Sequence, residues 1–92
     1  MAFKKLSGVK LPKKKQMLVR AICLNFRDRP KWEQEKILRL CDECAGAYSA
    51  ALFEAMTTEN TITKISLAYS ISQSRLYDFR RDFYERWFKK KS

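Results

Sequence analysis

Histidine is absent from this sequence, and glycine, proline and long apolar runs are scarce. Without histidine the chain lacks the usual acid–base residue of catalysis, and it also has no glycine-rich phosphate loop. Two glycines and two prolines are too few for the repeated turns of a β-sandwich or barrel. No apolar run approaches the roughly 18 residues of a membrane-spanning helix. We therefore expect an all-α protein that is not an enzyme, needs no cofactor and has no membrane partner.

The three cysteines are an odd number, which suits a reducing compartment and argues against a disulfide framework. Cys41 and Cys44 form a C-x-x-C pair, but zinc needs four ligands, so Asp42 or Glu43 would have to serve. The simpler interpretation places this pair, and Cys23, in the core. The N-terminus carries charge where a signal peptide has its apolar stretch, so we expect a cytoplasmic protein.

Positive charge dominates, with 20 Lys and Arg against 10 Asp and Glu, and it is concentrated at both ends. Residues 1–15 hold six lysines and no acid, and residues 61–92 hold eight basic and three acidic side chains. Residues 31–60 reverse this balance, with three basic and six acidic side chains. The asymmetry predicts a polyanionic partner, with nucleic acid ahead of a membrane surface.

Hydrophobic residues make up 46% of the 92 residues, enough for one domain with a modest core. Residues 1–12 mix lysines with Gly8 and Pro12 and show no sustained period, so we expect a flexible basic arm. Residues 13–92 are expected to form a single helical domain, a small bundle of about four helices.

The first helix is expected to begin at Lys13 and to end near Arg27. Asp28 is a plausible cap for the next helix, and Pro30 lies where a first-turn proline is tolerated. The apolar residues that recur at helical spacing in the first helix are Met17, Leu18, Ala21, Ile22 and residues 24–26.

A long second helix is predicted from Pro30 to about Thr57, because its apolar stripe keeps phase across Gly46. Gly46 is therefore expected to be a point of close packing rather than a stop. Such a helix would be about 40 Å long, so either a kink near Gly46 or a second subunit must accommodate it. The stripe consists of Trp32, Ile37, Cys41, Cys44, Tyr48, Leu52 and Ala55, widened by Leu38, Leu40, Ala45, Ala51 and Met56, with Glu33, Glu35, Asp42, Glu43 and Glu54 largely off it.

Residues 61–92 have the spacing of two helices that meet across a turn of three to four residues. Ile71 is expected to fill the corner, and Ser66 to be the small residue where the helices approach most closely. Ser72 is a good cap for the second helix. The apolar positions that this packing explains are Ile62, Ile65, Tyr69, Leu76, Phe79 and Phe83.

The stretch TITKISLAYSISQSRLYDFRRDFYERW resembles the helix-turn-helix of bacterial and phage transcription factors. It looks specifically like the C-terminal sigma-like module of phage late-gene activators of the RinA and ArpU type. In it ISLAYSIS corresponds to the small-residue helix, the turn and the serine cap, and the resemblance covers about a third of the chain. One departure is Ser70 at a turn position that is commonly glycine, where a positive φ is costly for serine.

The resemblance implies that the helix starting near Ser72 enters the major groove of duplex DNA with its first turns. Gln73 could then pair with adenine, Arg81 with guanine, and Asp78 could accept a hydrogen bond from cytosine. The expected base-contacting residues are Gln73, Ser74, Tyr77, Asp78 and Arg81, opposite the core face. The expected phosphate contacts are Lys64, Ser72, Ser74, Arg75 and Arg80. The lysines of the basic arm could follow the backbone or enter the minor groove.

Other interpretations remain open at this point. A protein-interaction module, such as a phage inhibitor or adaptor, could present the long second helix, and a DNA-packaging or recombination factor could share the DNA-binding element. The aromatic residues Phe79, Phe83 and Trp87 are assigned to the buried stripe rather than to a stacking platform, which leaves Tyr84 and Phe88 beside Tyr77. The small residues of segment 45–51 could serve the core or build a symmetric homodimer that binds paired half-sites.

Overall fold

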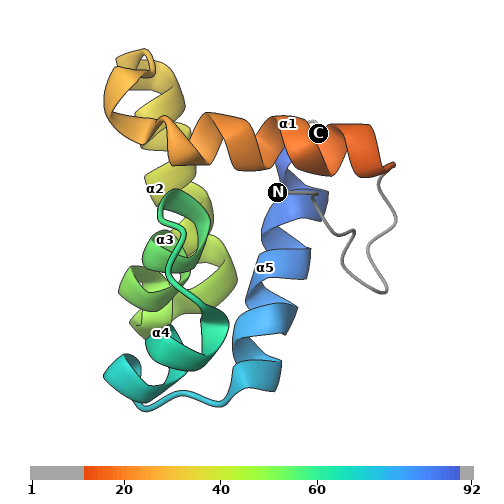
Figure 1. Cartoon of the computed structure of the whole chain (residues 1–92). Helices are drawn as coiled ribbons and strands as arrows, with labels where there is room; N and C mark the ends of the chain where they lie inside the picture. Colours follow the sequence, from red (N-terminus) through yellow and green to blue (C-terminus); the bar gives the residue numbers. More distant parts are fainter. Residues whose placement is uncertain (1–11, 90–92) are drawn as a thin grey trace.

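The computed structural model describes residues 12–89, which are mostly helical and contain no strand. This confirms the all-α prediction, although the described part has five α-helices instead of about four (Figure 1). The expected basic arm lies outside the described residues apart from Pro12. The helices are α1 (Lys13–Leu24), α2 (Lys31–Ala45), α3 (Ser49–Thr57), α4 (Ile62–Tyr69) and α5 (Gln73–Trp87), with 3-10 turns at Phe26–Asp28 and Gly46–Tyr48.

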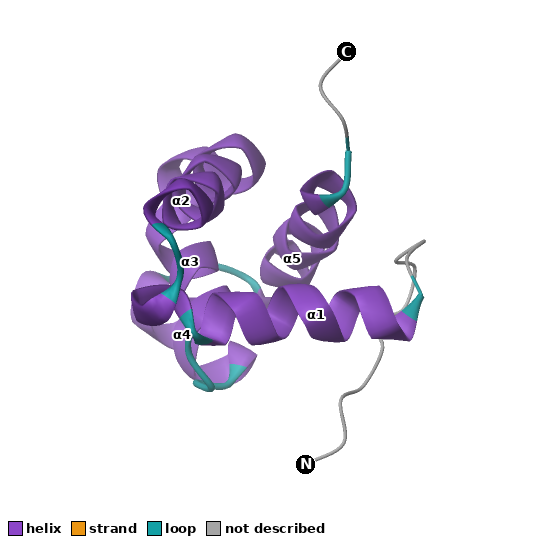
Figure 2. Ribbon diagram, turned by 90° about the horizontal axis from the view of Figure 1, so that it is seen from above, coloured by secondary structure: helices purple, strands orange, loops and turns teal. Residues whose placement is uncertain are grey.

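Helix α1 crosses α3 and α5, as the two perpendicular views show (Figures 1 and 2). It buries Gln16, Val19 and Cys23, so the expected core position of Cys23 is confirmed. Met17 and Leu18, which share the apolar spacing, are instead about half exposed. The reason is that α1 packs along a narrow stripe with steps of three and four residues, and the two residues lie beside it.

The starts of α1 and α2 both use proline. Pro12 precedes α1 and Pro30 precedes α2 as the N-cap residue, and neither cap involves a side-chain hydrogen bond. The expected cap Asp28 belongs to the 3-10 turn instead. Proline suits the start of a helix because the backbone N–H that it lacks would have no partner within the helix.

The predicted long helix is broken at Gly46, and the prediction that this glycine is a close-packing point was wrong. Gly46 has φ +53°, which ends α2, and a 3-10 turn then leads into α3. A Cβ atom at this position would meet no other atom within 4 Å. Glycine is needed here for its conformation, as at many helix C-termini, and not for contact with a neighbouring helix.

Because α2 is a separate helix, its buried face differs from the stripe read along the sequence. Ile37 and Cys41 are buried as predicted, but Trp32 is 63% exposed and Leu38 is 50% exposed. Glu33, expected off the stripe, is 5% exposed and forms an ion pair with Arg29. The pair compensates for the cost of burying the carboxylate.

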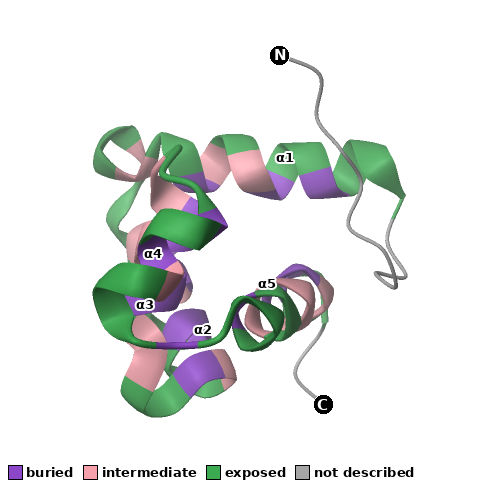
Figure 3. Ribbon diagram, turned by 60° about the horizontal axis from the view of Figure 1, so that its bottom comes forward, coloured by how far each residue is buried: buried purple, intermediate pink, exposed green. Residues whose placement is uncertain are grey.

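The interior consists of two clusters of buried side chains. The buried segments of the five α-helices are marked in Figure 3. The larger cluster joins α1, α2, α3 and α5, and the smaller joins α3, α4 and α5. The larger cluster contains Val19, Cys23, Ile37, Leu40, Cys41, Ala45, Leu52, Met56, Phe83, Tyr84 and Trp87. The smaller contains Ala51, Ala55, Ile62, Ile65, Ile71 and Leu76.

Candidate nucleic-acid interface

Helices α4 and α5 meet at a tight connection formed by residues 70–72. Ser70 follows α4 in the left-handed conformation, with φ +53° and ψ 45°, so this turn does contain the positive φ that is costly for serine. The backbone N–H of Ile71 donates to the Ser66 carbonyl over 3.1 Å, and the Ser66 hydroxyl donates to the Ile71 carbonyl. These bonds satisfy backbone groups that the end of α4 leaves without helical partners.

Both helices begin with a side-chain cap. The Thr61 hydroxyl accepts from the Lys64 backbone N–H over 3.1 Å, and the Ser72 hydroxyl accepts from the Arg75 N–H over 3.3 Å. The predicted cap at Ser72 is therefore confirmed. Its geometry fixes the direction in which α5 leaves the turn.

Four of the apolar residues predicted for this corner are buried (Ile62, Ile65, Leu76 and Phe83), whereas Phe79 is partly buried and Tyr69 is exposed. Ile65 and Leu76 are completely buried, and Ile71 is 5% exposed between them. Tyr69 is 36% exposed, and its hydroxyl donates to the Glu54 carboxylate over 3.3 Å. The corner packs around its isoleucines, while Tyr69 faces α3 at the surface.

The residues at the start of α5 are exposed, as the burial colouring of the ribbon shows (Figure 3). Gln73 and Ser74 are exposed, and Tyr77 is 44% exposed. No other helix of the described chain covers these three side chains. They lie in the first two turns of the helix, which can approach another molecule end first.

Charged side chains further along α5 form ion pairs within the helix. Arg81 forms an ion pair with Asp78, and Arg86 donates to Asp82 over 3.0 Å. Both pairs are partly exposed, so each stabilises the helix by at most about 1 kcal/mol. Arg81 can therefore exchange Asp78 for another acceptor at small cost.

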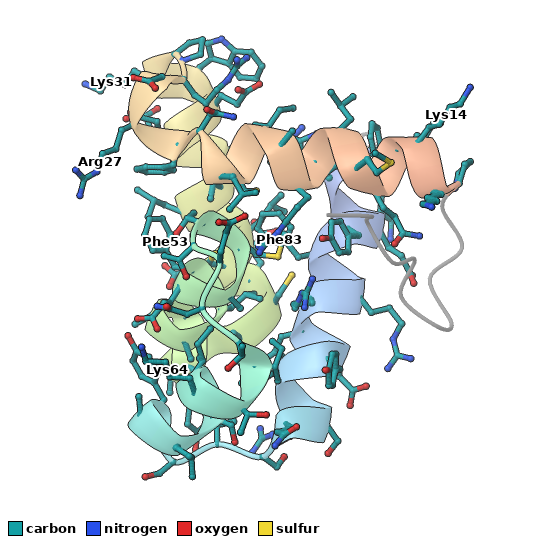
Figure 4. All side chains as sticks on the ribbon, viewed as in Figure 1. Lys14, Arg27, Lys31, Phe53, Lys64 and Phe83 are labelled. Carbon is teal, nitrogen blue, oxygen red and sulfur yellow. The ribbon has the colours of Figure 1, made fainter. Side chains whose placement is uncertain are left out.

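The residues expected to contact phosphates have different surroundings. Lys64 is exposed on α4 (Figure 4), and the hydroxyls of Ser72 and Ser74 lie 3.5 Å apart at the start of α5. The guanidinium carbon of Arg75 lies 5.3 Å from the centre of the Tyr48 ring and 5.7 Å from that of Phe79. The cation–π contact holds Arg75 against the protein while leaving the residue exposed.

Arg80 lies on the inner side of α5, four residues after Leu76 and four before Tyr84. Its Nε atom is buried and has no hydrogen-bond partner within the described chain. Tyr84 shares this inner side and is completely buried, in agreement with the packing role expected for the aromatic residues of this helix. Phe83 is buried as predicted and stacks on Trp87, with 5.9 Å between ring centres.

Sequence reasoning did not identify Arg20 or Gln16, which lie on the inner side of α1. Arg20 donates to the carbonyls of Ala55, Met56 and Thr58 at the end of α3, at 2.9 Å for Met56 and 2.8 Å for Thr58. A guanidinium suits this position because the C-terminus of a helix carries partial negative charge. The signal in the sequence was two polar residues four apart within the buried stripe of α1.

The cysteines have the surroundings of core residues. Burial raises the pKa of Cys23 and of Cys41 to about 12, so both remain protonated thiols near neutral pH. Within residues 12–89 no three His, Cys, Asp or Glu side chains are grouped so as to hold a metal ion. None of the helices in the same range has the length and apolar character needed to cross a membrane.

No family model matches this chain, and no match is found among curated proteins or solved structures.

Proposed function

We propose that this chain binds duplex DNA through α4 and α5, as a helix-turn-helix regulator of transcription of the phage or prophage type, in the cytoplasm. The observation that carries the proposal is the α4–α5 corner, where a left-handed Ser70 and a capped α5 leave Gln73, Ser74 and Tyr77 exposed. The net charge of +10 supports a polyanionic partner.

The first turns of α5 suit the major groove on physical grounds. The groove is about 12 Å wide and admits one α-helix, and the N-terminus of a helix attracts phosphate through its backbone N–H groups. The Ser72 hydroxyl lies at this end of α5, and Lys64 is exposed in the first turn of α4. In the proposal they contact the backbone and set the register, as Arg75 does after leaving its aromatic neighbours.

Sequence discrimination is assigned to side chains on the outward face. Gln73 would pair with adenine, and Arg81 would pair with guanine after exchanging Asp78 for the base. Asp78, once released, would accept from a cytosine amino group. A homodimer would place two such helices on paired half-sites.

The test is a fluorescence-anisotropy titration of duplex DNA at several salt concentrations, with three variants. We expect Lys64→Ala to weaken binding to all sequences alike and to reduce the salt slope by about 0.9, the value for one phosphate contact. Arg81→Ala should reduce discrimination between sequences, since a bidentate contact to guanine contributes about 1–3 kcal/mol.

Lys31→Ala is the matched control, because Lys31 is as exposed as Lys64 but lies at the opposite end of the molecule (Figure 4). Equal losses for Lys31→Ala and Lys64→Ala would contradict the assigned surface. Binding without any sequence preference would favour a DNA-packaging or recombination factor instead.

A second candidate function, a protein-interaction module, is favoured by a groove between α2, α3 and α4. Its volume is about 440 Å³, and its walls include Leu38, Phe53 and Tyr69, with Asp42 and Glu54 supplying charge. Leu38 is half exposed, so the groove offers an apolar side chain at the protein surface, as partner-binding sites often do. Leu38→Glu should abolish binding of a protein partner and leave the DNA titration unchanged, so this variant separates the two functions.

A further inference from the structure

A group of polar side chains lies between α1 and α5, and the proposed function does not use it. Gln16 and Arg20 come from α1, and Arg80 and Tyr84 come from α5, in each case four residues apart on the inner side of the helix. Arg80 and Tyr84 follow Gln73 by seven and eleven residues, so they lie on the same side of α5, about two and three turns further along the helix. This group is therefore separated from the exposed start of α5 along the helix axis.

Arg80 has no compensating partner among residues 12–89. No ion pair or hydrogen bond to its guanidinium is present there, and its Nε atom is buried. The Tyr84 hydroxyl is also buried without a hydrogen-bond partner. Since unpaired buried donors lose their hydration without replacement, this arrangement costs free energy in the unliganded chain.

Arg20 adds a second positive charge nearby. Burial lowers the pKa of Arg20, and the positive charge of Arg80 lowers it further, whereas Glu59 raises it. Glu59 is exposed and forms no ion pair with either arginine in the described chain. Arg20 uses three of its five N–H groups on the end of α3, which leaves two for another acceptor.

We propose that Arg80, with Arg20 and Tyr84, forms a binding site for a small oxyanion, a phosphate or carboxylate group, between α1 and α5. The terminal nitrogens of Arg80 are not among its buried atoms, so they are the point of first contact. An oxyanion bound there accepts from the guanidinium and offsets the like charges of the two arginines. A small side-chain shift then brings the Tyr84 hydroxyl and the Arg80 Nε–H to it.

The test is thermal unfolding of the full chain, without nucleic acid, in sodium phosphate, sodium acetate and sodium chloride at equal ionic strength and pH. We expect phosphate, acetate or both to raise the midpoint temperature above its value in chloride, because a ligand that binds only the folded state stabilises it. A rise in phosphate alone identifies a phosphate group, and a rise in acetate identifies a carboxylate. Equal midpoints in all three salts would overturn the proposal.

Two variants and one control locate the site. Arg80→Gln should weaken binding of the effective anion about tenfold or more, and Tyr84→Phe should weaken it less, since one neutral donor is lost. Arg27→Gln is the control, because Arg27 is exposed and points away from α5 (Figure 4). If Arg80→Gln fails to fold, the affinity of Tyr84→Phe for the effective anion is measured instead by calorimetric titration. This variant keeps the aromatic ring in the core. Unchanged affinity in Tyr84→Phe and Arg80→Gln would place the anion elsewhere and overturn the proposal.

Discussion

Replacing Ser70 by glycine should stabilise this protein, because the α4–α5 turn requires a left-handed residue. Ser70 has φ +53° and ψ 45°, and its hydroxyl makes no hydrogen bond within the described chain. A left-handed conformation costs a residue with a Cβ atom about 1–2 kcal/mol. Glycine removes this cost but has a more flexible unfolded state, which subtracts about 0.4–1 kcal/mol. The expected net gain for Ser70→Gly is therefore about 0.5–1 kcal/mol.

Urea and thermal unfolding would measure this gain. For a domain of this size, about 0.5–1 kcal/mol corresponds to a midpoint increase of roughly 3–6 °C. Ser70→Ala is the matched control, since it removes the hydroxyl and keeps the Cβ atom, and it should change stability by less than about 0.5 kcal/mol. The reasoning fails if Ser70→Gly lowers stability, or if Ser70→Ala raises it by the same amount.

Three further predictions concern the interior. Arg20→Met should cost about 2 kcal/mol in urea unfolding, because three carbonyls at the end of α3 lose a charged donor; no loss would contradict that capping role. Gly46→Ala should cost about 1–2 kcal/mol through backbone conformation alone, since its Cβ atom meets nothing within 4 Å, and unchanged stability would show that the turn adapts. Cys23 and Cys41 have their pKa raised to about 12 in the folded state, so their contribution to stability is complete below about pH 8.5 and is lost as the pH rises toward 12. Unfolding measured at pH 8, 9 and 10 should show a decline of up to about 1.4 kcal/mol per pH unit for each thiol, and the decline should be smaller in Cys41→Ala.

The sequence was most informative where local chemistry decides the structure. The Ser72 cap and the burial of Ile65 and Leu76 follow from the spacing of a few neighbouring residues, and all three were predicted. Each depends on contacts within the two helices or across one short turn. For the same reason the outward direction of Gln73 could be read from the helical period.

The errors arose where one sequence pattern allows two different structures, and contacts between residues far apart in the sequence decide which one forms. An apolar stripe in phase across Gly46 is compatible with one helix or with two, and only the positive φ of the folded chain decides. Trp32 looks like a core residue by type, but α3 and α5 pack against other parts of α2 and leave it 63% exposed. Arg80 was read as an outward phosphate contact because a charge usually reaches solvent, whereas its Nε atom is buried.

The most direct test of the central claim is an NMR titration of the isotopically labelled chain with a duplex DNA at low salt. The account predicts that backbone amide signals of Gln73, Ser74 and Tyr77 shift most, with smaller changes near Lys64, and that added salt reverses the shifts. Shifts confined to the groove around Leu38 and Phe53, or no shifts at all, would contradict it.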